Sequence, residues 1–110
     1  MVTPILNNIV NTIVESVSPQ KVILFGSRAR RNHQKKSDYD FMVIKKGVRN
    51  EREVSRRIYK ALFEKRIGQA VDVIVVTPEQ VERYRNTHCL VIAPALREGK
   101  EVYHARALPS

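Results

Sequence analysis

Two apolar segments, one ending in Gly-Ser and the next opening with paired aspartates, constrain the fold of this chain more than any other feature. Residues 22–25 run into Gly26-Ser27, and a spacer of ten residues separates these from Asp38 and Asp40 at the start of the second segment. Successive side chains of a strand point to opposite faces, so both aspartates lie on the same face of a sheet. The pattern predicts two strands joined by a basic connection, with two carboxylates side by side.

Carboxylates in this arrangement repel each other unless a cation lies between them. Mg²⁺ prefers carboxylate oxygens, and a Mg²⁺ site built on one or two protein carboxylates keeps room for the phosphates of a substrate. The backbone N–H groups of Gly26-Ser27 and the serine hydroxyl are suited to bind such phosphates. The structural alternative is a hairpin-like connection with solvated acids, and the combination of Gly-Ser with Asp-x-Asp disfavours it.

The run Gly-Ser-Arg-Ala-Arg at 26–30 and the later Ser-Asp-x-Asp at 37–40 resemble the signature of the nucleotidyltransferase superfamily that includes DNA polymerase β. They are most similar to its short members, the minimal nucleotidyltransferases, as is the ending Leu-Arg-Glu-Gly-Lys-x-Val-Tyr at 96–103. The resemblance implies an α/β (α+β) chain with the polymerase β-like fold, a small mixed β-sheet of three to four strands flanked by helices. One position departs from the pattern, because Arg31 stands where the family usually has glycine.

Length and composition fit one domain over residues 1–110, because 43% of the residues are apolar and can fill one modest core. The single Cys89 excludes an internal disulfide and suits a reducing compartment, and the three histidines are too scattered for a zinc site. No apolar segment is long enough to cross a bilayer, and the N-terminus lacks a signal pattern. We therefore expect a cytoplasmic protein with no membrane partner.

The net charge of +9 is concentrated around the paired aspartates. Between Arg28 and Arg66 there are 14 lysines and arginines against 5 acidic residues, whereas the rest of the chain has 6 of each. Such a field attracts polyanions, such as a nucleoside triphosphate or a nucleic acid. The helical part of this stretch is equally well explained as a solvated basic face. Direct nucleic-acid binding is the less favoured interpretation, because we expect no platform of interleaved aromatic residues there.

Helical and strand periodicities alternate along the chain. A first helix begins at Thr3-Pro4 and ends at Ser18-Pro19, with an apolar face that includes Ile5. The other expected elements are strands at 21–25, 38–44, 70–76 and 102–103, a short helix at 27–31, and helices after Asn50, from Thr77 to about 85, and at 90–97.

Asp72 is the anomaly of the third expected strand, whose other residues are apolar. A buried carboxylate without a partner strongly destabilises a fold or becomes protonated, so a buried Asp72 would need a partner. The resemblance implies that Asp72 is a third metal-binding carboxylate, delivered by a strand beside Asp38 and Asp40. The structural alternative is an acid on an edge strand that faces water.

The resemblance implies nucleotidyl transfer, in which an acceptor oxygen attacks the α-phosphorus of a triphosphate in line and pyrophosphate leaves. Two Mg²⁺ ions, or Mn²⁺ in their place, about 3.5–4 Å apart would clamp the attacking and leaving oxygens. Asp38 and Asp40 would hold both ions, and Asp72 would hold the ion at the acceptor and help to deprotonate it. The residues that would bind the phosphates of ATP are Gly26, Ser27 and Arg30, and for Arg30 a solvent-facing or structural role is an equal alternative.

Minimal nucleotidyltransferases are often paired with a small helical HEPN-domain protein in toxin–antitoxin systems. In these systems the nucleotidyltransferase is the antitoxin and transfers AMP to a tyrosine of the toxin. The resemblance therefore implies a HEPN toxin as partner and acceptor, and we expect another polypeptide to hold the acceptor. Two alternatives remain. One is the same chemistry on a small molecule such as an aminoglycoside, and the other is a non-catalytic module that binds a partner or RNA through the basic region.

Overall fold

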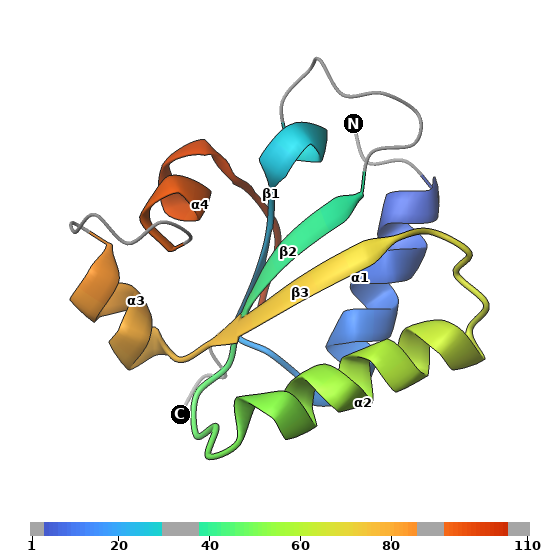
Figure 1. Cartoon of the computed structure of the whole chain (residues 1–110), viewed down its shortest axis with the longest axis horizontal. Coiled ribbons are helices and arrows are strands. Elements are labelled where there is room, and N and C mark those ends of the chain that lie inside the picture. Colours follow the sequence, from blue (N-terminus) through green and yellow to red (C-terminus); the bar gives the residue numbers. More distant parts are fainter. Residues whose placement is uncertain (1–3, 30–37, 86–91, 106–110) are drawn as a thin grey trace.

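In a computed structural model of the chain, which describes residues 4–29, 38–85 and 92–105, four strands form one mixed sheet (Figure 1). Their order in the sheet is β3-β2-β1-β4. β1 pairs antiparallel with both β2 and β4, whereas β2 and β3 run parallel. The strands are β1 (Lys21–Phe25), β2 (Tyr39–Ile44), β3 (Val71–Val76) and β4 (Lys100–His104). The expected mixed sheet flanked by helices is confirmed.

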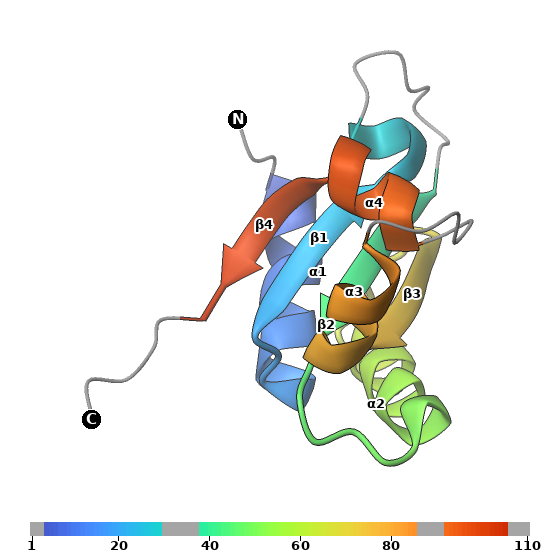
Figure 2. The same ribbon diagram turned by 90° about the vertical axis from the view of Figure 1, so that its left-hand side faces the viewer.

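Helices cover both faces of this sheet. α1 (Pro4–Val17) and α2 (Glu51–Glu64) share one core with the sheet, while α3 (Pro78–Tyr84) and α4 (Ile92–Glu98) contribute to a second core on the other face. Figure 2 shows α3 and α4 in front of the strands and α1 behind them. A short 3₁₀ helix, η1 (Gly26–Ala29), follows β1 directly, so the chain leaves the sheet at the Gly-Ser pair.

The alternation of side chains along β2 divides these two cores. Tyr39, Phe41 and Val43 pack in the core shared with α1 and α2, whereas Met42 and Ile44 pack in the core shared with α3 and α4. Asp38 and Asp40 have the parity of the second group. The two aspartates therefore belong to the sheet face that α3 and α4 cover, opposite Tyr39, as the Asp-x-Asp spacing predicted.

Helix-capping side chains fix where α2 and α3 begin. The Asn50 side chain accepts hydrogen bonds from the backbone N–H groups of Arg52 and Glu53, at 3.1 and 3.3 Å. Thr77 and Gln80 form a reciprocal capping box, in which each side chain accepts from the backbone N–H of the other residue. These contacts satisfy N–H groups that have no partner within the helix, and both starts agree with the sequence prediction.

The structure corrects several details of the sequence prediction. Ile5 is 45% exposed and does not belong to the buried face of α1, where the buried Thr12 lies instead with its hydroxyl hydrogen-bonded to the carbonyl of Asn8 at 2.7 Å. The second and third strands each begin one residue later than expected, at Tyr39 and Val71. No helix in the described part of the chain has the length and apolar character that a bilayer crossing requires.

Phe41 and Phe63 provide a matched test of where the core lies. Phe41 is completely buried in the central strand, whereas Phe63 is 83% exposed on α2. We expect Phe41→Ala to lower the free energy of unfolding by about 3–5 kcal/mol, because it removes a buried ring and leaves a cavity. Phe63→Ala should change it by no more than about 0.5 kcal/mol. Urea denaturation measures both values, and comparable losses would contradict the assigned core.

Candidate functional site

Asp40 is the second residue of β2, an inner strand of the sheet, and it is paired with residues of both neighbouring strands. It is paired with Phe25, the last residue of β1, and with Asp72 of β3. Asp40 is half-buried, whereas Asp38 and Asp72 are exposed. The fold thus brings the three predicted carboxylates to one region at the sheet end where β1 passes into η1.

Gly26 forms the floor against which the Asp40 carboxyl group rests. Its φ angle is +72°, a conformation that L-residues with a side chain rarely adopt. A Cβ atom added to Gly26 would collide with Oδ2 of Asp40 and lie 3.2 Å from its Cγ. Glycine is therefore required here for two reasons, the turn of the backbone and the close approach of the carboxylate.

The surroundings of Asp40 disfavour its charged form. Burial raises the pKa of the Asp40 carboxyl above its ordinary value of 3.8, and the negative charges of Asp72 and Asp38 raise it further. A cation bound beside Asp40 would remove this penalty, because it would compensate the neighbouring charges. The raised pKa is a common property of functional sites, although structural clusters of charge also produce it.

The carboxylates form an open arrangement rather than a closed metal cage. Within the described residues, no group of three or more His, Cys, Asp or Glu side chains is close enough together to hold an ion. Asp38 and Asp72 are nevertheless near enough to raise the pKa of Asp40. Mg²⁺ is usually bound through one or two carboxylates, with substrate phosphates and water completing its shell. The oxygen donors and the close floor at Gly26 fit such a site.

Asp72 occupies an edge strand, which corrects the expectation of a buried third strand. β3 stands at the end of the sheet, and its first four residues are only partly covered, with Asp72 itself exposed. Asp72 therefore needs no partner to offset burial. The alternative of an edge-strand acid that faces water therefore describes the exposure of Asp72 correctly. Because Asp72 is also paired with Asp40, its predicted role in binding metal stays a prediction.

A contact that the sequence analysis missed links η1 to β2. The guanidinium carbon of Arg28 lies 4.3 Å from the centroid of the Tyr39 ring, a cation–π distance. Tyr39 in turn stacks on Phe41, with ring centroids 6.3 Å apart and planes at 6°. Because Tyr39 faces the α1 side, Arg28 holds the turn against the sheet face opposite the carboxylates. In the sequence, this contact could have been suspected from the arginine two residues after Gly26 and from the aromatic residue between the two aspartates.

Of the other residues that the sequence singled out, the structure describes the position of Ser27 but not those of Arg30 and Arg31. Ser27 follows Gly26 within η1. Arg30 and Arg31 lie outside the described residues, together with most of the basic spacer, so the predicted role of Arg30 and the effect of the missing glycine stay predictions.

The family model described as polymerase beta, nucleotidyltransferase matches residues 7–106. The chain belongs to this family. A search of curated proteins finds no significant match.

Solved structures support the same fold for this nucleotidyltransferase-family chain. A chain of a toxin–antitoxin complex with AMP-PNP superimposes with a TM-score of 0.61 at 18% identity, covering 91% of this chain and 73% of that one. A protein from Sulfolobus solfataricus assigned as a nucleotidyltransferase gives 0.62 at 21% identity, with 91% and 78% covered. A mutant of the toxin–antitoxin pair MntA-HpeT, with two aspartates two positions apart replaced by glutamate, gives 0.58 at 16%, with 91% and 73% covered. At these identities the likeness concerns the fold.

Gly26→Ala tests the contact between the turn and Asp40, and Gly47→Ala is its matched control. Gly47 has a similar φ of +74°, but a Cβ there would meet nothing within 4 Å. Both variants should lose about 1–2 kcal/mol of stability, since an added Cβ strains a left-handed backbone. Only Gly26→Ala should also displace the Asp40 carboxyl, shifting its ¹³C NMR signal and its pKa. An unchanged Asp40 signal in Gly26→Ala would contradict the described contact.

Asp40→Asn should stabilise the metal-free protein at neutral pH. Because the pKa of Asp40 is raised in the folded state, the folded protein retains a proton there that the unfolded chain releases, beginning near pH 3.8. The contribution of Asp40 to stability therefore falls as pH rises from that value to the raised pKa. The gain in melting temperature from Asp40→Asn should be small near pH 3.8 and larger at pH 7. Glu64→Gln, an exposed site on α2, is the charge-matched control.

A gain that is equal at both pH values, or as large in Glu64→Gln, would contradict this electrostatic account of Asp40.

Proposed function

We propose that this chain is a Mg²⁺-dependent nucleotidyltransferase that transfers AMP from ATP to a hydroxyl group. The acceptor is a tyrosine of a small helical HEPN toxin, so that the chain acts as an antitoxin. The observation that carries the proposal is the position of Asp40, which is held against Gly26 and paired with Asp72. Membership of the nucleotidyltransferase family supports the same chemistry.

The three carboxylates have different roles in this proposal. Asp38 and Asp40 would hold the divalent cations, and the half-buried Asp40 gains most from them because its charged form is otherwise disfavoured. The exposed Asp72 would face the acceptor and receive the proton of its hydroxyl group. When bound, Mg²⁺ or Mn²⁺ neutralises charge on the triphosphate and on the attacking and leaving oxygens.

The turn after β1 would bind the triphosphate. The absence of a side chain at Gly26 lets the Asp40 carboxylate lie close against the turn, so phosphates bound at the turn would lie next to this carboxylate. The N–H groups of Gly26 and Ser27, the Ser27 hydroxyl and the guanidinium of Arg30 would bind the phosphate oxygens. The attacking oxygen must lie about 3–3.5 Å from the α-phosphorus, so productive transfer depends on how the acceptor is held.

The solved neighbours favour a protein acceptor over a small molecule. Two of them are toxin–antitoxin complexes, one with AMP-PNP, and the other carries replacements of two aspartates spaced as Asp38 and Asp40 are here. We therefore place the aminoglycoside-type reaction and the non-catalytic binding module second. The protein encoded by the gene adjacent to this one is the first acceptor to test.

Wild-type protein co-expressed with that neighbour should add one or more AMP units to it, detected by intact-mass spectrometry. Asp38→Asn and Asp40→Asn should abolish the addition, because each removes a charge that holds the cation while keeping the shape of the side chain. Asp72→Asn should also block transfer but keep most of the binding of ATP with Mg²⁺, since Asp72 serves the acceptor. Ser27→Ala should be milder and weaken only ATP binding.

Transfer at the wild-type rate in both Asp38→Asn and Asp40→Asn would refute the metal assignment. An unmodified neighbour in a tight complex would favour the binding module, and modification of an added aminoglycoside would favour the small-molecule reaction.

A further inference from the structure

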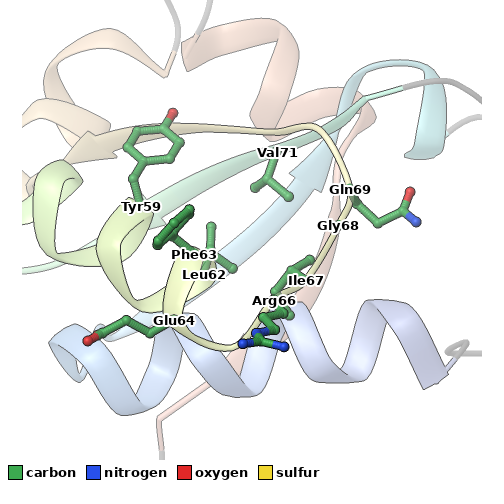
Figure 3. Close-up of a pocket in the computed structure, with 9 residues that line it drawn as sticks. All are labelled: Tyr59, Leu62, Phe63, Glu64, Arg66, Ile67, Gly68, Gln69 and Val71. Atoms are coloured by element: carbon green, nitrogen blue, oxygen red, sulfur yellow. The ribbon is translucent and has the colours of Figure 1, made fainter.

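Two aromatic side chains on α2 are exposed beside the free edge of the sheet. Phe63 is 83% exposed and Tyr59 is 42% exposed, and they stand one helical turn apart. Figure 3 shows both projecting from α2 near the segment that leads into β3, with Ile67 and Val71 on the other side. The pocket they share has a volume of about 810 Å³. Neighbouring apolar side chains that are exposed together and surrounded by polar residues are typical of an interaction site, whereas single exposed apolar residues are common on any protein surface.

The pocket continues along β3 as a groove. A second cavity of about 550 Å³ lies on the other side of Tyr59 and is lined by Arg52, Arg56 and Val73. Tyr59 therefore stands between the two cavities and contributes to both. We call the two cavities together the α2–β3 groove. Its apolar floor and its length along an edge strand suit a protein segment with apolar side chains, which can enter both cavities.

The hydroxyl of Tyr59 closes part of the free edge of β3. It accepts a hydrogen bond from the backbone N–H of Val73 at 2.9 Å. An incoming strand could not pair there without displacing this bond, and such capping is one way in which proteins protect an edge strand. The groove is therefore suited to a partner that inserts side chains, such as a helix, rather than to one that adds a strand.

The charge around the α2–β3 groove selects the partner. Residues 45–66 contain nine lysines and arginines against three glutamates, a net charge of +6. The two cavities themselves are lined by Arg52, Arg56 and Arg66 together with Glu51 and Glu64, a net charge of +1, so most of the positive surplus lies around the groove rather than in it. A second copy of this chain would bring the same positive surface against its own, so charge disfavours a symmetric dimer through this face. An acidic surface is complementary to it and would be steered toward it.

We propose that the α2–β3 groove docks an acidic helical protein whose apolar side chains enter the pocket at Phe63, and that this protein is the acceptor of the transferred nucleotide. The identity of the partner as the acceptor rests on the proposed function, whereas the location of the docking surface does not. Asp72 lies on β3 between Val71, which lines the first cavity, and Val73, which lines the second. The Asp72 side chain points to the opposite face of the sheet from these two valines. A partner bound in the groove would therefore have to reach around the free edge of β3 to bring its acceptor group to this carboxylate.

A single-stranded nucleic acid is the other polyanion to consider. Tyr59 and Phe63 are exposed among basic residues, so the expectation that this stretch has no interleaved aromatic residues was wrong. Bases stack on open aromatic faces. Here the Tyr59 hydroxyl is held by the strand, and both rings border a concave apolar pocket rather than a flat platform. The shape favours an apolar protein side chain.

The test uses the purified protein encoded by the adjacent gene and measures its binding by titration calorimetry. Phe63→Ala should weaken the complex by about tenfold or more, as loss of a central apolar anchor does. Ile5→Ala, which removes an exposed apolar side chain from α1, should leave the affinity unchanged. Arg52→Glu with Arg56→Glu should slow association and reduce its dependence on salt, whereas Lys100→Glu on the opposite edge strand should not.

Rates of AMP addition separate this inference from the proposed function. Phe63→Ala should raise the KM for the partner and leave kcat and the binding of ATP with Mg²⁺ unchanged. If the partner binds in a Phe63-dependent way but gains no AMP, the groove stands and the proposed function fails. If the partner gains AMP equally from wild type and Phe63→Ala, the function stands and the groove assignment fails.

Three further results would overturn the groove assignment. They are no binding of the neighbour by wild type, a dimer of this chain alone that Phe63→Ala dissociates, and binding of an oligouridine RNA that depends on Phe63.

Discussion

The contact between the Asp40 carboxyl and the backbone of Gly26 is the constraint on which the proposed site depends. It exists because β1 ends opposite Asp40 and turns away with a positive φ that only glycine adopts easily. The cation–π contact of Arg28 with Tyr39 and the stack of Tyr39 on Phe41 hold the turn from the other face of the sheet. Buried aromatic packing on one face thus fixes the position of a charged group on the other.

Much of the fold could be predicted because local rules and tertiary structure agree. The period of two in β2 separates the aspartates from Tyr39 and Phe41, and the capping residues Asn50 and Thr77 begin helices as expected. The order of strands could not be read in this way. An apolar strand such as β3 looks the same in sequence at an edge or in the centre, because helices cover much of both faces in either place. The exposure of Asp72 followed only from the strand order.

The exposed side of α2 shows the same limit. The buried Ile58 and Leu62 lie one helical turn apart, as the periodicity of a helix requires, but periodicity does not distinguish a solvated helix face from one that binds a partner. Phe63 became informative only when the structure placed it beside a pocket at the edge of β3. Asp72 and the α2–β3 groove then share β3, so the carboxylate assigned to the acceptor and the proposed partner surface belong to the same edge strand.

The most direct test of the proposed metal and nucleotide site is paramagnetic broadening of backbone NMR signals by substoichiometric Mn²⁺ with a non-hydrolysable ATP analogue. We expect the amide signals of Gly26, Asp40 and Asp72 to broaden first, and those of Tyr103 and His104, which pair with the first residues of β1 at the other end of the sheet, to remain sharp. Asp40→Asn should abolish the selective broadening. Broadening centred elsewhere in the protein, or the same broadening in Asp40→Asn, would contradict the assignment of these carboxylates as the cation site.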